Sequence, residues 1–526
     1  MNGRTSSVLP FPRDYRGSGI LLHVTSLPSR YGIGDVGPGA QSWLERLSQA
    51  GQSWWQALPL GPTGDNNSPY EPLSSFAGNT MVISPDWLIE DELLRPSDCS
   101  DPPFPEGTVD YGAVIPFKRR LLEKAWERFK ASASADLRPA YKRFCEEHNS
   151  WLEDYALFRV LKAKFGKTHY LEWPAELVRR KPAALEQARR ELADQVNQAC
   201  FEQFLLFRQT ERLKAHAHRK GLKLIGDLPF FVSADSSDVW ADPQLFLLDD
   251  QLRPRFVAGV PPDYFSAQGQ LWGNPVYNWE IHRESGYRWW IDRLRSLLTH
   301  VDIIRIDHFR GFLAAWHVPG GALTAQFGNW VPGPSAEILR AAERELGSLP
   351  FLAEDLGLIT HEVYALRDEF HLPGMRVLQF AFDGYPDNPY LPENYVHNTV
   401  VYTGTHDNPT TREWFEDLPV DQQENVRRHL KERGAKSDEA ARALMEVAWS
   451  SVAAVAIAPA QDLLNLGREA RMNVPGHPEG NWRWRCTEAM SSDAAFESLG
   501  DLTKNARRTR VLTAADSGTL EAASTN

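Results

Sequence analysis

Cysteine is scarce in this chain, and its placement excludes several classes of protein. The four cysteines among 526 residues lie far apart, and no two of them form a CxxC pair (Cys99, Cys145, Cys200 and Cys486). A disulfide framework or a zinc cluster needs thiols that are more numerous or closer together. We therefore expect free cysteines in a reducing compartment and no metal site.

Long apolar runs and an excess of positive charge are also absent. The longest uninterrupted apolar run, at 452–459, is too short to span a bilayer, and the first residues lack the apolar core of a signal peptide. The net charge of −12 argues against nucleic acid and against an acidic membrane surface, since both favour a basic partner. These features predict a cytoplasmic, soluble protein with neither kind of partner.

Nucleotide-binding motifs are missing as well. No P-loop occurs, and the glycines at 32–37 match the GxGxxG pattern without its context. The apolar segment before them ends too early, and no acidic residue follows about 20 positions later. We expect no cofactor.

Tryptophan, in contrast, is abundant. Several of the eighteen tryptophans stand beside glycine, proline or asparagine in loop-like sequence. Aromatic rings stack on the flat C–H faces of sugars, although any one tryptophan is more often a core or interface residue. As a group, the tryptophans favour a carbohydrate ligand.

Apolar segments alternate with helical stretches along most of the chain. Seven segments are predicted to be strands: 19–25, 53–60, 223–232, 300–307, 350–354, 375–382 and 399–405. Near-continuous apolar strands that alternate with helices predict an α/β fold with a parallel sheet. Seven strands found in this way are compatible with the eight of a (β/α)8 TIM barrel, which can exceed about 400 residues with insertions.

Two regions interrupt this alternation. Residues 113–221 are heavily charged with helical spacing of apolar residues, which predicts an inserted, mainly helical subdomain. Residues 252–278 are rich in proline, glycine and aromatics, which predicts a long lid or binding loop at the active site. We interpret 1–526 as a single catalytic barrel unit, with a disordered tail at 512–526.

Three of the apolar segments run into a carboxylate where the strand should give way to a loop. These carboxylates belong to Asp307, Glu354 and Asp407. The carboxyl ends of barrel strands are where chemistry is done, because several loops converge there on a rigid base. Three acids at one barrel mouth suggest cleavage of a glycosidic bond, which needs neither metal nor cofactor.

The first two acids have distinct surroundings. Strand alternation places Arg305 and Asp307 on one face, so the guanidinium should lower the pKa of Asp307, as a nucleophile requires. A buried structural ion pair is the alternative. Glu354 follows an apolar stretch that should raise its pKa, which suits a general acid. Its neighbour Asp355 could instead be the functional residue.

Asp407 lies at a predicted strand-to-helix turn. Asn408 is a natural N-cap and Pro409 a natural first helical residue. Asp407 could therefore serve the helix start alone.

Many segments together carry a resemblance to a known family. They include Leu27-Pro-Ser-Arg-Tyr-Gly-Ile-Gly-Asp35, Ser68-Pro-Tyr70, Gly226-Asp227-Leu-Pro229, Gly259-Val-Pro-Pro-Asp263-Tyr-Phe-Ser266, Trp272-Gly-Asn-Pro275, Pro373-Gly-Met-Arg376, Arg471-Met-Asn473 and the three acid segments. Along nearly its whole length the chain resembles the amylomaltases, the 4-α-glucanotransferases of glycoside hydrolase family 77.

The resemblance implies a role for each candidate residue. Asp307 would be the nucleophile, Glu354 the general acid/base and Asp407 the carboxylate that binds the distorted sugar. The other residues that it implies as substrate contacts are Tyr70 as a stacking platform, Asp227, Arg305, His308 and His406 around the cleaved sugar, Asp263, Trp272 and Asn274 on the acceptor side or lid, and Asn473. The chain departs from the family pattern at Pro409, where the family has aspartate, and at 475–480.

The implied reaction is a retaining double displacement on α-1,4-glucans and maltooligosaccharides, catalysed by a monomer or homodimer. A retaining enzyme holds its two reacting carboxyl groups about 5–5.5 Å apart. Two other readings stay open. One is an α-glucan hydrolase that uses the same three acids, and the other is a glucan-binding protein without activity.

Overall fold

The computed structural model describes residues 10–12, 14–100, 103–132, 136–262, 266–477 and 479–509. The tail predicted at 512–526 therefore lies outside the described residues. Within these ranges, no helix has both the length and the apolar character needed to cross a membrane.

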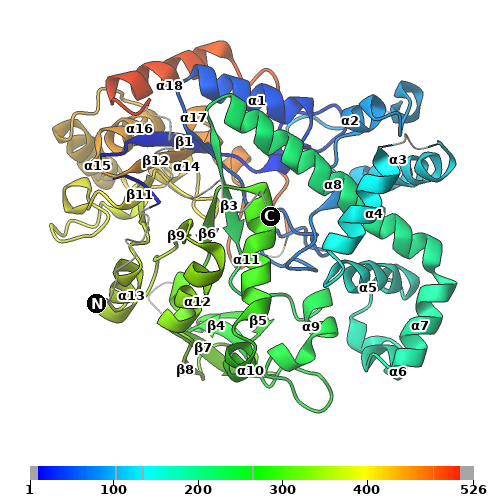
Figure 1. The fold of residues 1–526 in the computed structure, drawn as a ribbon. Coiled ribbons are helices and arrows are strands. Elements are labelled where there is room, and N and C mark those ends of the chain that lie inside the picture. The colour runs from blue at the N-terminus through cyan, green and yellow to red at the C-terminus, as the bar shows by residue number, and fades with distance from the viewer. Residues whose placement is uncertain are drawn as a thin grey trace, which may run out of the picture.

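Eight parallel strands close into a barrel, and each pairs with the next barrel strand along the chain (Figure 1). They are β1 (Gly17–Leu21), β2 (Trp54–Gln56), β3 (Lys223–Leu228), β6 (Ile303–Ile306), β9 (Phe351–Ala353), β10 (Gly374–Val377), β11 (Thr399–Tyr402) and β12 (Val455–Pro459). The TIM-barrel prediction is confirmed. The strand missing from the sequence-based set is β12, whose small, wholly buried residues closely follow a helix without a clear turn signal.

Helices cover the barrel and explain why its strands are mostly apolar and lack a polar face. The first α-helix of the long β2–β3 connection is α2 (Pro85–Glu90), and those outside that connection are α1 (Pro38–Gln49), α9 (Ser237–Ala241), α10 (Trp279–Glu284), α11 (Arg288–His300), α12 (Ala336–Leu346), α13 (His361–Glu369), α14 (Thr411–Glu416), α15 (Val420–Glu432), α16 (Ala440–Ser450), α17 (Ala460–Leu463) and α18 (Asp493–Asn505). A strand such as β11 is buried along its whole length, so alternation between polar and apolar residues has no place in it.

The connection between β2 and β3 is mainly helical, as its composition predicted, and lies to one side of the barrel (Figure 1). It contains α3 (Tyr111–Ser132), α4 (Leu137–Glu147), α5 (Leu152–Lys164), α6 (Ala175–Val178), α7 (Pro182–Glu191) and α8 (Ala193–Arg219). Helix α8 packs against α4 and α5 and also against α1 and α11. It therefore joins the inserted helices to the helical layer of the barrel.

A second, antiparallel sheet with strand order β5-β4-β7-β8 stands beside the barrel. Its strands are β4 (Phe256–Val260), β5 (Gln270–Pro275), β7 (Ala314–Pro319) and β8 (Asn329–Pro332). The segment 252–278 is therefore not the irregular loop that its composition predicts, because it contains β4 and β5. Gly259 hides the strand pattern, and a Cβ there would lie 2.5 Å from the carbonyl oxygen of Gln270.

Candidate active site

The three candidate acids share the carboxyl end of the barrel. Asp307 directly follows β6, Glu354 directly follows the neighbouring strand β9, and Asp407 lies in the loop after β11. Parallel strands in one barrel bring these separate segments to the same mouth.

One guanidinium links two of the carboxylates. Arg305 Nη1 donates to Asp227 Oδ1 and Oδ2 at 2.8 and 2.9 Å, and to Asp307 Oδ1 at 3.0 Å. Asp227 and Arg305 are register partners on β3 and β6, which explains the contact across 78 positions of sequence. The Asp227 side chain is fully buried, whereas that of Asp307 is 31% exposed. Asp307 thus has one side held by the protein and one side open.

The pKa of Asp307 differs from the sequence-based prediction. Burial, together with the negative charges of Asp227 and Asp407, raises the pKa of Asp307 to about 6, although the positive charge of Arg305 opposes the rise. Arg305 pulls this pKa down, as predicted, but the predicted net lowering was wrong, because burial outweighs the guanidinium. The carboxylate of Asp307 is nevertheless mainly ionised above about pH 6.

Glu354 is held by two main-chain donors. His308 N donates to Oε2 and Leu356 N to Oε1, both at 2.8 Å. Burial raises the pKa of Glu354 to about 7 although these donors and Arg305 oppose it, and the charge of Asp307 adds to the rise. The predicted upward shift is confirmed, and between pH 6 and pH 7 at least half of Glu354 is protonated while at least half of Asp307 is ionised.

Asp355, the sequence-based alternative to Glu354, is held in buried ion pairs. It is 1% exposed, and it accepts hydrogen bonds from Arg367 Nη1 at 2.6 Å and Met375 N at 2.7 Å. Arg376 contacts it at 3.3 Å.

Asp407 has the opposite electrostatic setting to Glu354. Asn473 Nδ2 donates to its Oδ1 at 2.6 Å, and His406 Nε2 lies 3.3 Å from its Oδ2. Desolvation by the surrounding protein opposes its charge, but His406 and Asn473 outweigh that effect and lower the pKa of Asp407 to about 2. Asp407 therefore stays ionised throughout the physiological range.

The helix after Asp407 begins later than predicted. Its N-cap is Thr410, whose Oγ1 accepts from Glu413 N, and its first residue is Thr411. Asn408, the predicted N-cap, instead accepts hydrogen bonds from N and Oγ1 of Thr405 at 2.9 and 2.8 Å. Asp407 consequently lies outside the helix and does not cap it.

An aromatic wall adjoins the carboxylates. The Tyr70 ring stacks on His406 at 4.8 Å, and its hydroxyl donates to Asp227 Oδ2 at 2.7 Å. Trp482 lies 5.9 Å from both rings. Trp482 was not among the predicted site residues, and its only sequence signal is its position beside Asn481 in loop-like sequence.

On the other side, His308 faces the small sheet. It has a left-handed backbone with φ 50°, and its buried Nε2 has no hydrogen-bond partner among the described residues. Burial and the charge of Arg310 lower its pKa to about 3, so the ring is neutral. The ring of Trp272 meets it edge to face at 4.9 Å.

The last two predicted residues differ in what the structure says of them. Asn274 Nδ2 donates to the carbonyl oxygen of Val232 at 2.8 Å, so this amide ties β5 to the loop after β3. Asp263 lies outside the described residues.

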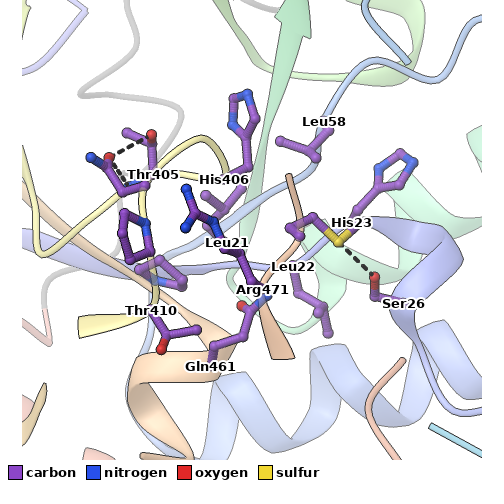
Figure 2. Close-up of a pocket in the computed structure, with 14 residues that line it drawn as sticks. Leu21, Leu22, His23, Ser26, Leu58, Thr405, His406, Thr410, Gln461 and Arg471 are labelled. Atoms are coloured by element: carbon purple, nitrogen blue, oxygen red, sulfur yellow. Dashed lines mark hydrogen bonds between the residues drawn. The ribbon is translucent and has the colours of Figure 1, made fainter. Parts of the chain in front are cut away.

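An open pocket of about 430 Å³, including the solvent at its mouth, adjoins His406 (Figure 2). It is lined from the ends of β1, β11 and β12 by residues that include His23, Gln461 and Arg471. His23 is 7% exposed, its Nδ1 has no partner among the described residues, and burial lowers its pKa to about 3. Sequence reasoning missed His23, although a polar residue just past the end of an apolar strand is a usable signal.

The chemistry available here is that of carboxylates and hydrogen-bond donors. In the part of the chain that the structure describes, no cluster of three His, Cys, Asp or Glu side chains could hold a metal ion. A protonated carboxyl beside an ionised one, with a third acid firmly ionised, can protonate a leaving oxygen and stabilise positive charge at an adjacent carbon.

Comparison with known proteins gives consistent results. The sequence profile of the 4-alpha-glucanotransferase family matches residues 22–491. The chain is 48% identical to a 4-alpha-glucanotransferase of Synechocystis sp. over 90% of this chain and 94% of that protein, and 48% identical to one of Thermus thermophilus over 89% and 94%. The solved structure of an amylomaltase from Streptococcus agalactiae in complex with acarbose superposes with a TM-score of 0.90 at 36% identity, covering 94% of this chain and 99% of that one.

Proposed function

The chain belongs to the 4-alpha-glucanotransferase family and transfers segments of α-1,4-glucan between sugar chains, and on that premise we propose a role for each residue of the site. The observation that carries the proposal is the difference in protonation between the acids. Glu354 has a pKa near 7, Asp307 near 6 and Asp407 near 2.

The first half of the reaction breaks the glycosidic bond. Glu354 gives its proton to the glycosidic oxygen while Asp307 attacks the anomeric carbon, and the bond between that carbon and oxygen breaks. Arg305 Nη1 donates to Oδ1 of Asp307, and among the described residues Oδ2 has no hydrogen-bond donor, so Oδ2 is the oxygen available for attack. The product is a covalent glucosyl-enzyme and a released chain with a free 4-hydroxyl.

The second half restores the linkage. The 4-hydroxyl of an acceptor gives its proton to the Glu354 carboxylate and attacks the anomeric carbon, which displaces Asp307. Two inversions at one carbon retain the α configuration.

Asp407 has a separate role. The anomeric carbon gains positive charge in both transition states, and a carboxylate that stays ionised stabilises that charge while accepting sugar hydroxyls. Tyr70, Asp227, Arg305, His308, His406 and Asn473 surround the same space and complete the sugar site. His308 Nε2 is buried and has no partner among the described residues, so it is available for a hydroxyl.

Transfer exceeds hydrolysis only if a sugar, and not water, reaches the glucosyl-enzyme. We assign the exclusion of water to the β4–β5 region, 252–278, in which Trp272 packs against His308. Asp263, Trp272 and Asn274 would form the acceptor side.

Incubation of the enzyme with maltotriose alone, with products separated by chain length, tests the function. Glucose together with longer maltooligosaccharides and little new reducing sugar is the expected result. Shorter sugars with rising reducing ends would instead support a hydrolase, and binding without turnover would support a glucan-binding protein.

Three further assignments belong to this proposal. The chain acts as a single catalytic unit, as a monomer or homodimer, and in the cytoplasm, which agrees with its four free cysteines. Light scattering after size exclusion measures the oligomeric state.

A further inference from the structure

The loop that carries His406 and Asp407 is fastened at both ends by one buried carboxylate, that of Asp462. Asp462 lies in α17, just after β12, and is 3% exposed. Helix α17 directly follows β12, the neighbour of β11 in the barrel, so Asp462 can reach the loop after β11 from the side.

Three hydrogen bonds join Asp462 to the loop. Thr403 Oγ1 donates to Oδ2 at 2.5 Å, Thr411 Oγ1 donates to the same oxygen at 2.7 Å, and Thr411 N donates to Oδ1 at 2.8 Å. Thr403 is the first residue after β11, and Thr411 is the first residue of α14. One side chain therefore fixes the entry to the loop and its exit.

A second buried side chain settles the direction of these bonds. Gln379 Nε2 donates to the carbonyl oxygen of Pro409 at 3.1 Å and to Thr411 Oγ1 at 3.2 Å. Because the Thr411 hydroxyl accepts from Gln379, its own proton points to Asp462. The site for Asp462 thus requires an acceptor, which a carboxylate supplies and an amide nitrogen does not.

Asp462 forms no ion pair with any described residue, and burial raises its pKa. A buried carboxylate held by hydrogen bonds alone is expensive to desolvate. What this arrangement provides is a rigid link from β12 to the main chain on both sides of Asp407, while Asn473 and His406 hold the Asp407 side chain itself.

We propose that Asp462 is a positioning residue for glucosyl transfer: by binding Thr403 and Thr411 it sets the place at which Asp407 meets the sugar in the transition state. The inference rests on the role proposed above for Asp407. It concerns geometry that matters in the transition state more than in the ground state, so its loss should lower kcat and leave KM nearly unchanged.

The first test is Asp462→Asn, which keeps the shape of the side chain and one acceptor oxygen but replaces the other oxygen with an NH2 group, a donor. A displacement of about 1 Å at a reacting group can cost roughly 100-fold in rate. We expect kcat per folded molecule to fall about 10- to 100-fold, with KM for maltotriose changed less than about twofold. An unchanged kcat in the folded variant would overturn the proposal.

Asp302→Asn is the matched control. Asp302 is 5% exposed and accepts from Leu224 N and contacts His218 Nε2, both at 2.8 Å, but it precedes β6 at the opposite end of the barrel. This change should lower Tm and leave kcat per folded molecule unaltered. If both variants lose kcat equally, the loss reports general destabilisation and the positioning role fails.

A second pair of variants covers the case in which Asp462→Asn does not fold. Thr411→Val removes only the hydroxyl that Asp462 and Gln379 share, whereas Thr411→Ser keeps it. The valine variant should reproduce the fall in kcat and the serine variant should recover most of it. Equal rates for the two would contradict the proposal.

A double-mutant cycle with Asp407→Asn separates this proposal from the role of Asp407 itself. With an α-glucosyl fluoride donor, whose good leaving group keeps residual turnover measurable, Asp462→Asn should add little further loss in the Asp407→Asn background. Effects that multiply would show that Asp462 does not act through Asp407. A fully active Asp407→Asn enzyme would instead reject the role of Asp407.

Discussion

The pH dependence of transfer should follow the two reacting carboxyl groups, and Asp227 should control one side of it. Turnover needs Asp307 ionised and Glu354 protonated. With pKa values of about 6 and about 7, the productive form amounts to about 60% of the enzyme at pH 6.5 and about 10% at pH 5 or pH 8. The profile is therefore a narrow bell centred between the two values.

Asp227→Asn should move the acid side of this bell alone. Removal of the Asp227 charge frees Arg305 for Asp307, and it also removes a negative charge that raises the pKa of Asp307. A fall of about one unit, about 1.4 kcal/mol, would raise activity at pH 5 from about 15% to about 60% of each enzyme's own maximum.

The assay is the initial rate of maltotriose disproportionation from pH 4.5 to pH 9, with each enzyme normalised to its maximum. Normalisation removes any overall loss that the substitution causes. Asp302→Asn, at the other end of the barrel, should move neither limb. An acid limb that stays in place or moves upward in Asp227→Asn would refute the electrostatic account of the site.

Three further predictions concern stability and the ratio of hydrolysis to transfer. Glu354→Gln should raise the free energy of unfolding at pH 8 by about 1–3 kcal/mol, measured by denaturant titration. Because the pKa of Glu354 is raised on folding, the stability that its neutral form contributes is fully present below the ordinary pKa of glutamate and is lost as pH rises through about 7. No gain in stability at pH 8 would contradict this. Trp272→Ala should raise the ratio of hydrolysis to transfer, measured as new reducing ends against longer products, and an unchanged ratio would remove β5 from water exclusion. Asp355→Asn should cost about 3 kcal/mol of stability, measured by denaturant titration, because the buried guanidinium of Arg367 then keeps only the exposed carboxylate of Asp368. The kcat per folded molecule should be retained, and a large loss of kcat would favour Asp355 as a functional residue.

Local pattern predicted the elements that depend on local pattern. Seven barrel strands are apolar runs bounded by polar sequence, and the acids after β6 and β9 follow such runs directly. Strand β12 was not predicted, because the alanine-rich sequence after α16 shows no boundary between the helix and the strand. Strands β4 and β5 were not predicted, because their glycines and prolines are typical of loops. At Gly259 a glycine is needed because the two strands approach closely there.

The position of the candidate acids at the barrel mouth was predictable from sequence, and their electrostatics only in part: the raised pKa of Glu354 was predicted and that of Asp307 was not. Which acids end up at the barrel mouth follows from strand ends. Which acid shares Arg305 follows from the register of β3 on β6, and the burial that raises the pKa of Asp307 follows from the closed barrel, so neither is visible in the local sequence. Trp482 and His23 come from distant loops that only the closed barrel brings together, so neighbouring sequence contains little trace of their position.

Four carboxylates, those of Asp227, Asp307, Glu354 and Asp407, lie around the buried guanidinium of Arg305 at the barrel mouth. This shortage of positive charge explains why the four differ in pKa and in proposed role. Asp227 takes Arg305 with both oxygens, and Asp407 has His406 and Asn473 of its own. Asp307 receives a single contact from the shared guanidinium, and Glu354 receives only main-chain donors. These two are the acids whose pKa values rise toward neutrality, and they are also the two that must change state during the reaction, one by bonding to carbon and the other by exchanging a proton. In the proposed mechanism, the carboxylates with fixed charge hold the sugar, and the poorly compensated ones react with it.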